Sequence, residues 1–406
     1  MRRPEKNETA EYIGDMKELN LIAATTFGLE AVLARELSDL GVTEHNTVNG
    51  RIYFKGDVRT LVKANLWLRT ADRILLNMGE FKALSFEELF RGITEIPWEK
   101  LLPVDAKFIV NARSVKSKIY SLRDIQAISK KAIVERLKQA YGCDWLEETG
   151  SRYMIEIAFL EDRVTVTVDT SGHGLNKRGY RQEVGKSPIK ETLAAGLIMV
   201  SRWRPDRPFL DPFCGTGTFG IEAAMIGMNI APGLKAEFDA EKWQGFCPEI
   251  WEEERVAAIK AINREPHLRI YCSDIDYFQL KLAEKHAELA GVKGHIHFQK
   301  IDFAETGSRF EYGCIITNPP YGERLLEKQE AEEIYRGMGR HFPETFKTWS
   351  VYVITSCETF EKLYGRAADK KRKIYNGGIK CDYYQFFGPK PPRPKTEEPG
   401  EVLTNP

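Results

Sequence analysis

The sequence lacks an excess of charge of either sign, since Lys+Arg and Asp+Glu both number 59. The overall charge therefore does not indicate a polyanionic partner, and a surface that binds polyanions would have to come from local clusters of basic residues. The first 18 residues lack the apolar core of a signal peptide, and no later apolar run is long enough to span a membrane. The seven cysteines are scattered and form no CxxC pair, and the seven histidines are scattered too, so neither a disulfide framework nor a metal site is indicated. These absences favour a cytoplasmic globular protein without membrane contact or metal.

The N-terminal half contains two predicted α/β units, 19–68 and 69–170, after a flexible segment 1–18. Residues 19–25 and 50–56 are strand-like, and residues 26–40 have helical apolar spacing. In the second unit, the pattern predicts a strand over 107–115, a helix over 121–141, and two strands joined by a turn at Glu161-Asp162.

A local basic field lies inside this otherwise neutral chain. Between Lys107 and Lys138 there are nine Lys or Arg residues against two acids. A solvated helix face explains part of this pattern, and binding to nucleic acid phosphates is the functional alternative. The candidate phosphate-binding residues here are Arg113, Lys116, Lys118, Arg123, Lys130 and Lys131.

The C-terminal half begins with a basic, glycine-rich junction, 171–189, and continues as alternating strands and helices over 190–388. That rhythm implies a doubly wound, mostly parallel sheet. A closing hairpin with its turn at 376–378 follows, and then a proline-rich, polar segment, 389–406, which is expected to be disordered. In the junction, His173, Arg178 and Arg181 either touch a nucleic acid or steady the domain interface; with Lys177, the two arginines join the candidate phosphate-binding set.

The stretch "FLDPFCGTGTFGIEAA", residues 209–224, carries the first candidate site. A strand ends at Asp211, and a turn containing Gly215 and Gly217 opens a helix, so the backbone can approach a ligand closely. Such ligands bind at the carboxyl ends of parallel strands. The GxGxxG fingerprint and the Lys-Ser/Thr of a P-loop are both missing, and the acid before the turn favours a ligand that carries positive charge.

Acidic residues also end the next two predicted strands. Asp274 suits hydrogen bonding to ribose hydroxyls, and the nearby Asp276 is a rival or a helix N-cap. Asp302 would bind an adenine amino group, or it is simply a turn carboxylate.

The stretch "IITNPPYGERL", residues 315–325, places two prolines directly after a strand. The side-chain oxygen of Asn318 and the carbonyl of Pro319 are acceptors that together could take both hydrogens of a planar NH₂ group. Pulling that nitrogen towards a tetrahedral shape frees its lone pair and stabilises a transition state. Tyr321 offers a face for a ring to stack on, while Pro319 and Pro320 fix the acceptor geometry.

The motifs "DPFCGTGTFGIEAA", "SDID" and "TNPPYGERL", in this order, resemble the class I S-adenosylmethionine-dependent methyltransferases of the amino-methylating (N/D)PPY type. The resemblance implies a Rossmann-like α/β domain in which Asp211, Gly215 and Gly217, with Phe213 and Thr216, surround the methionine part of the cofactor. It further implies that Asp274 binds the ribose, that Asp302 binds the adenine, and that Asn318, Pro319, Pro320 and Tyr321 hold the target amine. The segment "KSPIKETLAA" resembles the one before the cofactor motif in this group, so Pro188, Lys190 and Glu191 would border the pocket.

The N-terminal half is similar to a ferredoxin-like segment followed by a THUMP domain, an α+β RNA-binding region, and "DTSGHGLNKRGYR" looks like the junction of the YpsC/RlmL-like family. The resemblance implies methylation of guanine N2 in large-subunit (23S) ribosomal RNA. Adenine N6 in DNA or RNA, a protein glutamine, guanine N2 in tRNA, and a non-catalytic RNA-binding assembly factor are the alternatives. Nothing in the sequence specifies the oligomeric state.

Overall fold

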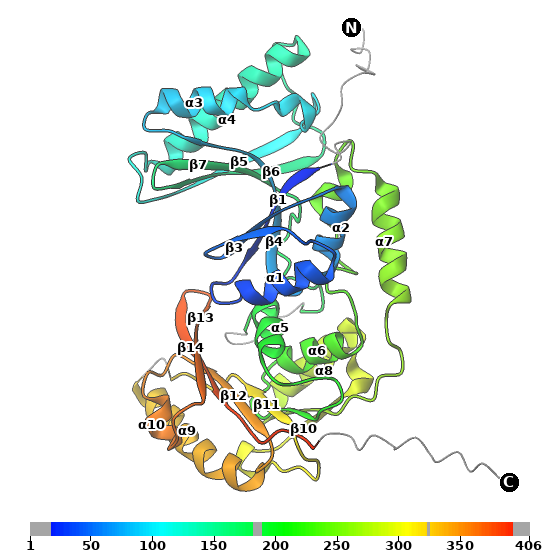
Figure 1. Cartoon of the computed structure of the whole chain (residues 1–406), viewed down its shortest axis with the longest axis vertical. Helices are drawn as coiled ribbons and strands as arrows, with labels where there is room; N and C mark the ends of the chain where they lie inside the picture. Colours follow the sequence, from blue (N-terminus) through cyan, green and yellow to red (C-terminus); the bar gives the residue numbers. More distant parts are fainter. Residues whose placement is uncertain (1–17, 182–188, 323–324, 393–406) are drawn as a thin grey trace, which may run out of the picture.

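The computed structural model describes residues 18–181, 189–322 and 325–392 (Figure 1). Two seven-stranded sheets lie one above the other along the long axis of the molecule, the N-terminal sheet at the top and the C-terminal sheet below it. Most of the expected flexible N-terminus, most of the expected disordered tail and part of the junction fall outside the described residues.

The N-terminal sheet runs through both predicted α/β units, in the strand order β2-β3-β1-β4-β7-β6-β5. The strands are β1 (Leu19–Thr25), β2 (His45–Val48), β3 (Arg51–Gly56), β4 (Ala71–Lys82), β5 (Lys107–Val115), β6 (Arg152–Leu160) and β7 (Arg163–Asp169). The long strand β4 pairs with β1 on one side and with β7 on the other. The two units therefore share one sheet instead of forming separate ones.

One face of this sheet is covered by helices α1 (Glu30–Asp39), α2 (Val58–Trp67), α3 (Phe86–Glu95) and α4 (Leu122–Tyr141). Alternate strand residues such as Phe108, Tyr153 and Ile155 are buried with these helices in a single core. Their neighbours, such as Arg113 and Glu156, point to the opposite face because successive strand residues alternate.

The C-terminal sheet has the strand order β10-β9-β8-β11-β12-β14-β13, and every pairing in it is parallel except the two that β14 makes with β12 and β13. Its strands are β8 (Phe209–Asp211), β9 (Ile270–Asp274), β10 (Ile296–Lys300), β11 (Cys314–Thr317), β12 (Ser350–Thr355), β13 (Lys370–Asn376) and β14 (Ile379–Phe386). Its helices are α5 (Glu191–Val200), α6 (Thr218–Gly227), α8 (Tyr277–Ala290), α9 (Leu325–Thr345) and α10 (Phe360–Tyr364), whereas α7 (Pro248–Lys260) packs against α2 beside the N-terminal sheet (Figure 1). The predicted doubly wound, mostly parallel sheet is confirmed.

The hairpin β13–β14 reaches from the lower sheet towards the upper one (Figure 1). Arg372 donates a hydrogen bond of 2.6 Å from Nη1 to the carbonyl of Gly28, in the loop after β1. Next to it, the rings of Phe27 and Tyr375 meet edge to face with centroids 6.3 Å apart. The hairpin thus connects the two halves of the molecule directly.

None of the helices in the described part of the chain combines the length and the apolar character that crossing a bilayer requires.

Candidate active site

The functional motifs meet at the carboxyl edge of the C-terminal sheet. Strands β9, β8 and β11 are adjacent and parallel, so the residues that end them lie at one edge. Asp211 ends β8, Asp274 ends β9, and Asn318 directly follows β11. The Thr317 hydroxyl donates a hydrogen bond of 2.6 Å to Oδ1 of Asp211, which ties the NPPY segment to the glycine turn.

A cleft opens at this edge, and five predicted site residues line it: Asp211, Phe213, Gly215, Thr216 and Asn318. Five further lining residues were not indicated by the sequence: Ile189, Cys214, Thr218, Phe219 and Gln279. Ile189 and Gln279 come from segments flanking α5 and opening α8, and only the assembled fold brings them to the glycine turn.

The glycine turn has the backbone that its composition predicts. Gly215 and Gly217 have φ angles of +50° and +80°, in the left-handed region that favours glycine. A Cβ on Gly217 would lie 2.9 Å from Cβ of Ala283, whereas a Cβ on Gly215 would meet no atom within 4 Å. Gly217 therefore allows α6 to pack against α8, and Gly215 leaves space on the cleft side.

Carboxylates shape the electrostatics of the cleft. Burial raises the pKa of Asp211 to about 7, although hydrogen bonds from Thr317 and from the Phe213 amide work against this rise. Burial also raises the pKa of Asp274, whose Oδ2 accepts a hydrogen bond of 2.8 Å from the Gly215 amide. A ligand with positive charge would stabilise both carboxylates, so the cleft suits a cationic group.

The other two acidic residues that follow strands, Asp276 and Asp302, are helix N-caps. Asp276 is the N-cap of α8 and accepts from the amides of Phe278 and Gln279. Asp302 caps the short helix 303–305 through the Ala304 amide at 2.8 Å, and the structure does not bring it into contact with the other site residues. The structure thus shows the turn contact of Asp302, and its adenine-binding role stays a prediction.

The NPPY segment forms a rigid corner beside the glycine turn. The Tyr321 hydroxyl donates a hydrogen bond of 2.6 Å to Oδ1 of Asn318 and accepts one from Sγ of Cys381 at 3.6 Å. Burial raises the pKa of Tyr321 well above its ordinary value, so the hydroxyl remains a donor. The Tyr335 hydroxyl donates to the Pro320 carbonyl at 2.7 Å, which holds the second proline in place.

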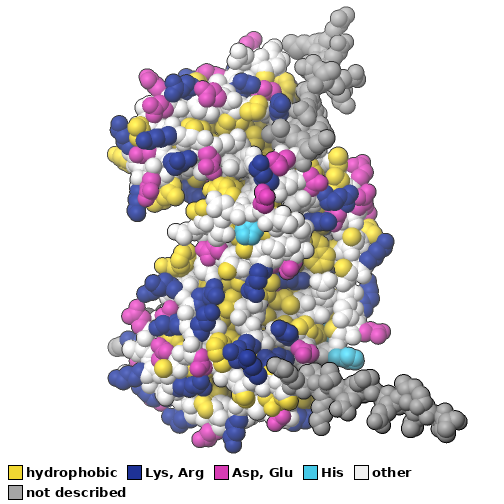
Figure 2. All heavy atoms as spheres, in the orientation of Figure 1, with side chains coloured by type: hydrophobic (Ala, Val, Ile, Leu, Met, Phe, Trp, Pro, Cys, Tyr) yellow, Lys and Arg dark blue, Asp and Glu magenta, His cyan; other side chains and the backbone are white. Residues whose placement is uncertain are grey.

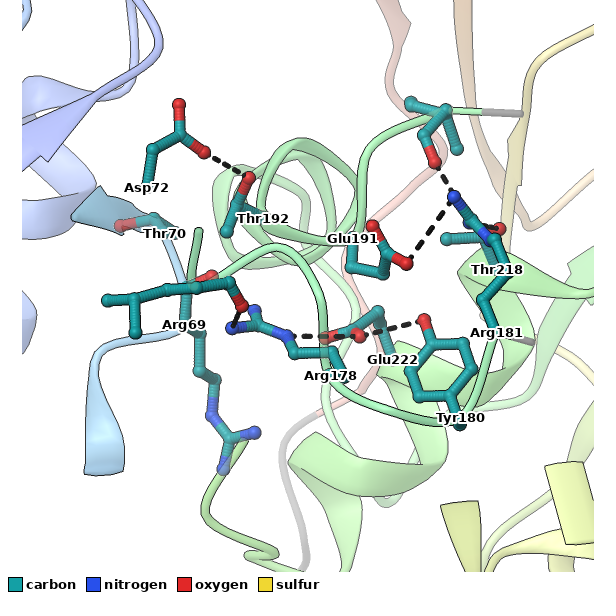
Figure 3. A network of polar contacts seen from close by, with 12 residues as sticks. Arg69, Thr70, Asp72, Arg178, Tyr180, Arg181, Glu191, Thr192, Thr218 and Glu222 are labelled. Atoms are coloured by element: carbon teal, nitrogen blue, oxygen red, sulfur yellow. Dashed lines mark hydrogen bonds and ion pairs between the residues drawn. The ribbon is translucent and has the colours of Figure 1, made fainter. Parts of the chain in front are cut away.

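Arg181 forms hydrogen bonds with residues of the cleft wall, among them Thr218 (Figure 3). Its Nη2 donates to Oγ1 of Thr218 at 2.7 Å and to the Ile189 carbonyl at 3.1 Å, and its Nη1 lies 3.3 Å from Oε1 of Glu191. Thr218 and Ile189 both line the cleft. Glu191 therefore contacts the cleft wall indirectly, through its ion pair with Arg181. Lys190 is the N-cap residue of α5, and Pro188 lies outside the described residues.

Arg178 lies at the centre of the interface between the two halves (Figure 3). It is 4% exposed, its Nε lies 3.6 Å from Oε1 of Glu222, and its Nη2 donates to the Arg69 carbonyl. Tyr180 donates to the same Glu222 oxygen at 3.0 Å. A guanidinium buried in this way cannot reach a phosphate, so the RNA-binding prediction for Arg178 is wrong. For Arg178 the structure supports the alternative, a role in holding the domain interface, whereas the contacts of Arg181 lie within the C-terminal half.

The other predicted phosphate-binding residues do not form one surface. Arg113 points to the open face of the N-terminal sheet, whereas Arg123, Lys130 and Lys131 belong to α4 on the helical face. Lys116 and Lys118 follow β5 in the connection to α4, and Lys177 and His173 are exposed in the junction. The clustering seen in the sequence is thus divided by the sheet itself.

The strand order, the glycine turn and the adjacent NPPY corner define a Rossmann-like methyltransferase domain, preceded by a ferredoxin-like and THUMP region. Three family models match the chain: "RlmL ferredoxin-like domain" over residues 20–75, "THUMP domain" over 83–169 and "RMKL-like, methyltransferase domain" over 178–385. The chain belongs to this family of THUMP-containing RMKL-like methyltransferases. The cofactor of this chain, as of its family, is S-adenosyl-L-methionine.

Similar proteins agree with this assignment. YpsC of Bacillus subtilis (strain 168), named as a candidate RNA methyltransferase, is 48% identical over 94% of this chain and 100% of its own length. The ribosomal RNA large subunit methyltransferase K/L of Psychromonas ingrahamii is 33% identical over 95% of this chain, which spans 53% of that longer protein. SMU.472, named as a candidate methyltransferase and solved in complex with SAH, is 43% identical with a TM-score of 0.88, covering 93% of this chain and all of that one.

Proposed function

We propose that this chain transfers a methyl group from S-adenosyl-L-methionine to the exocyclic amino group of an RNA base, and that the base is guanine, methylated at N2, in 23S ribosomal RNA. The observation that carries this proposal is the position of Asn318, in the same cleft as Gly215 and one residue from the Thr317–Asp211 hydrogen bond. A planar amine held by Asn318 would therefore face the cofactor.

The residues present fit that cofactor. Its cationic methionine part suits the cleft beside Asp211, and Gly215 leaves room for a close approach to backbone. When bound, the cofactor supplies an electrophilic methyl group on a sulfonium. Asp274, at the adjacent strand end, is the proposed ribose ligand, and Asp302, which follows β10, is the proposed adenine ligand.

Asn318 would act on the amine through the acceptor capacity that Tyr321 leaves free. An amide oxygen can accept two hydrogen bonds, and the Tyr321 hydroxyl uses one of them. The second can accept from the target NH₂ group, with the Pro319 carbonyl as its partner acceptor. Hydrogen bonds that pull the nitrogen towards a tetrahedral shape stabilise the transition state more than the ground state. Positioning next to the methyl donor provides the rest of the acceleration.

Two observations support RNA as the substrate. The chain contains a THUMP domain, and the relatives named above include methyltransferases of RNA. Kinship to a ribosomal RNA large subunit methyltransferase supports large-subunit ribosomal RNA over tRNA as the substrate. All seven cysteines are free, which fits a reducing compartment such as the cytoplasm.

The test is mass spectrometry of nucleosides from 23S RNA and from tRNA of a strain without this gene. We expect one N2-methylguanosine to be missing from 23S RNA and to return when the unchanged gene is supplied, but not when Asn318→Ala is supplied. Loss of N6-methyladenosine, or loss from tRNA alone, would replace the proposed substrate by an alternative. A complete set of methylated nucleosides in both RNAs, together with no heat of S-adenosylmethionine binding in calorimetry, would leave a non-catalytic assembly factor.

A further inference from the structure

A groove of about 800 Å³ lies on the face of the N-terminal sheet that points away from the helices. It extends from β3 and β1 to β6 and β5, so both halves of the shared sheet contribute to it. Figure 2 shows the outline of the molecule hollowed at this level, between the upper and lower parts. The sequence did not indicate this groove, because its lining comes from residues spread over all seven strands of the sheet.

Four arginines line the groove: Arg51, Arg73, Arg113 and Arg152. Only two acids, Glu156 and Asp169, line it with them. Arg51 and Arg113 share a single carboxylate, with nitrogen atoms 3.0 and 3.3 Å from Oε1 of Glu156. One carboxylate cannot neutralise two guanidinium groups, so the groove keeps a positive charge that suits phosphates.

The rim of the groove is apolar and aromatic. Phe27, Val115 and Leu160 are 44%, 51% and 55% exposed, and apolar side chains gathered at the rim of one groove are a feature of binding sites. Arginines combined with exposed rings and aliphatic side chains suit unpaired nucleotides, whose bases stack and whose phosphates are held. A duplex keeps its base faces buried and would leave this rim unused.

The groove leads towards the active site along the hairpin β13–β14. Phe27, on the groove rim, contacts Tyr375 of β13, which is 40% exposed. From there, Cys381 of β14 contacts the Tyr321 hydroxyl, which in turn bonds to Asn318. Lys370 and Lys373 of the same hairpin are exposed and have no acidic partner within 4 Å among the described residues.

We infer that an unpaired stretch of the substrate RNA lies in this groove and passes over Phe27 and Tyr375, so that its target base enters the cleft at Asn318. The inference rests on the proposed function, since it assigns a path to the RNA that the methyltransferase domain modifies. The cations of the groove and of the hairpin hold the phosphates, and the two rings guide the bases from one half of the molecule to the other.

The first test measures the affinity of the full chain for a labelled 20-nucleotide single-stranded RNA as a function of salt. Arg51→Gln combined with Arg113→Gln should weaken binding about tenfold and make the salt dependence less steep by about 1.4, since each phosphate contact to a single strand contributes about 0.7. Glu156→Gln should have the opposite sign, with tighter binding, because it releases both arginines from their shared carboxylate. Lys260→Gln, on α7, is the matched control and should bind like the unchanged protein.

The second test is ultraviolet cross-linking of the same RNA, followed by peptide mapping. We expect cross-links to Phe27 and Tyr375, and a lower kcat/KM on 23S RNA for Phe27→Ala with Tyr375→Ala at unchanged cofactor affinity. If the unchanged protein methylates RNA but Glu156→Gln fails to tighten binding, or the cross-links map to α4, this path is wrong and the proposed function stands. If the unchanged protein methylates no RNA at all, the proposed function fails and the path fails with it.

Discussion

The hydroxyl of Tyr321 donates a hydrogen bond of 2.6 Å to Oδ1 of Asn318, so the ring orients the amide that faces the cofactor cleft. Tyr321→Phe keeps the ring and removes this bond together with the long contact from Sγ of Cys381. We expect kcat to fall about tenfold, the scale of one lost hydrogen bond of 1.4 kcal/mol, with cofactor affinity unchanged. Single-turnover methylation of 23S RNA measures the first quantity and calorimetry the second. An unchanged kcat would show that Asn318 needs no support from Tyr321.

Asn318→Ala removes the proposed acceptor itself. We expect methyl transfer to fall by about 10²–10³-fold, as it does when a single transition-state hydrogen bond is lost, while S-adenosylmethionine still binds. Transfer of a radioactive methyl group to RNA is the measurement, with calorimetry of cofactor binding as the control for folding. Full turnover in this variant would remove the assigned role.

The raised pKa of Asp211, about 7, links cofactor binding to pH. Below that pH the free carboxyl is protonated and must lose a proton when a cationic ligand binds, so affinity should fall by up to about tenfold for each pH unit below 7. Above pH 8 affinity should be level. Calorimetric titration between pH 5.5 and 8.5 measures this, and Asp211→Asn should bind more weakly with a flatter profile. A constant affinity across the range in the unchanged protein would place Asp211 outside the cofactor site.

Arg181 and Lys177 lie four residues apart in the junction, and we expect only the substitution of Arg181 to change the affinity for the cofactor. Arg181→Ala removes the donors that hold Thr218 and the Ile189 carbonyl, and we expect cofactor affinity to fall at least about tenfold. Lys177→Ala removes an exposed cation and should leave cofactor affinity unchanged. Parallel calorimetry of the two variants decides this. Equal cofactor affinity in both would mean that the cleft wall is stable without Arg181.

Arg178→Ala leaves the buried carboxylate of Glu222 without its cationic partner. Breaking a buried pair from one side costs about 3–5 kcal/mol, so we expect a large fall in the free energy of unfolding. Arg178→Met with Glu222→Leu removes both charges and should recover much of this loss. Thermal unfolding of the three proteins provides the measurement, and equal melting temperatures for the single and double variants would contradict the coupling.

The sequence predicted the C-terminal fold well because the strands of its sheet have strong local patterns. Strands β5 and β1 and helix α4 were likewise predicted within one residue of their observed ends. Strand β4 and helix α7 escaped notice, since β4 alternates poorly and α7 carries a run of glutamates without a clear apolar stripe. That two α/β units share one sheet depends on long-range pairing, which no local pattern encodes.

The residues of the candidate site were predicted from sequence motifs. The prediction of the phosphate-binding residues was less accurate, because it rested on charge alone. Arg178 and Arg181 were placed among the candidate phosphate-binding residues because the sequence does not reveal their buried acidic partners. Glu222, the partner of Arg178, is distant along the sequence, and Glu191, the partner of Arg181, lies on a separate helix. The basic segment "KKRK" at residues 370–373 was visible in the sequence, but only the fold shows that it belongs to the hairpin that contacts both the loop at Phe27 and Tyr321.

The pairing of β4 with both β1 and β7 limits how this protein can be divided. A THUMP fragment beginning at residue 83 would leave β7 with a bare edge, and its free backbone donors and acceptors would recruit other chains. Such a fragment should aggregate, whereas residues 18–181 keep every interior strand paired. Family boundaries drawn from sequence therefore do not mark the smallest autonomous folding unit of this molecule.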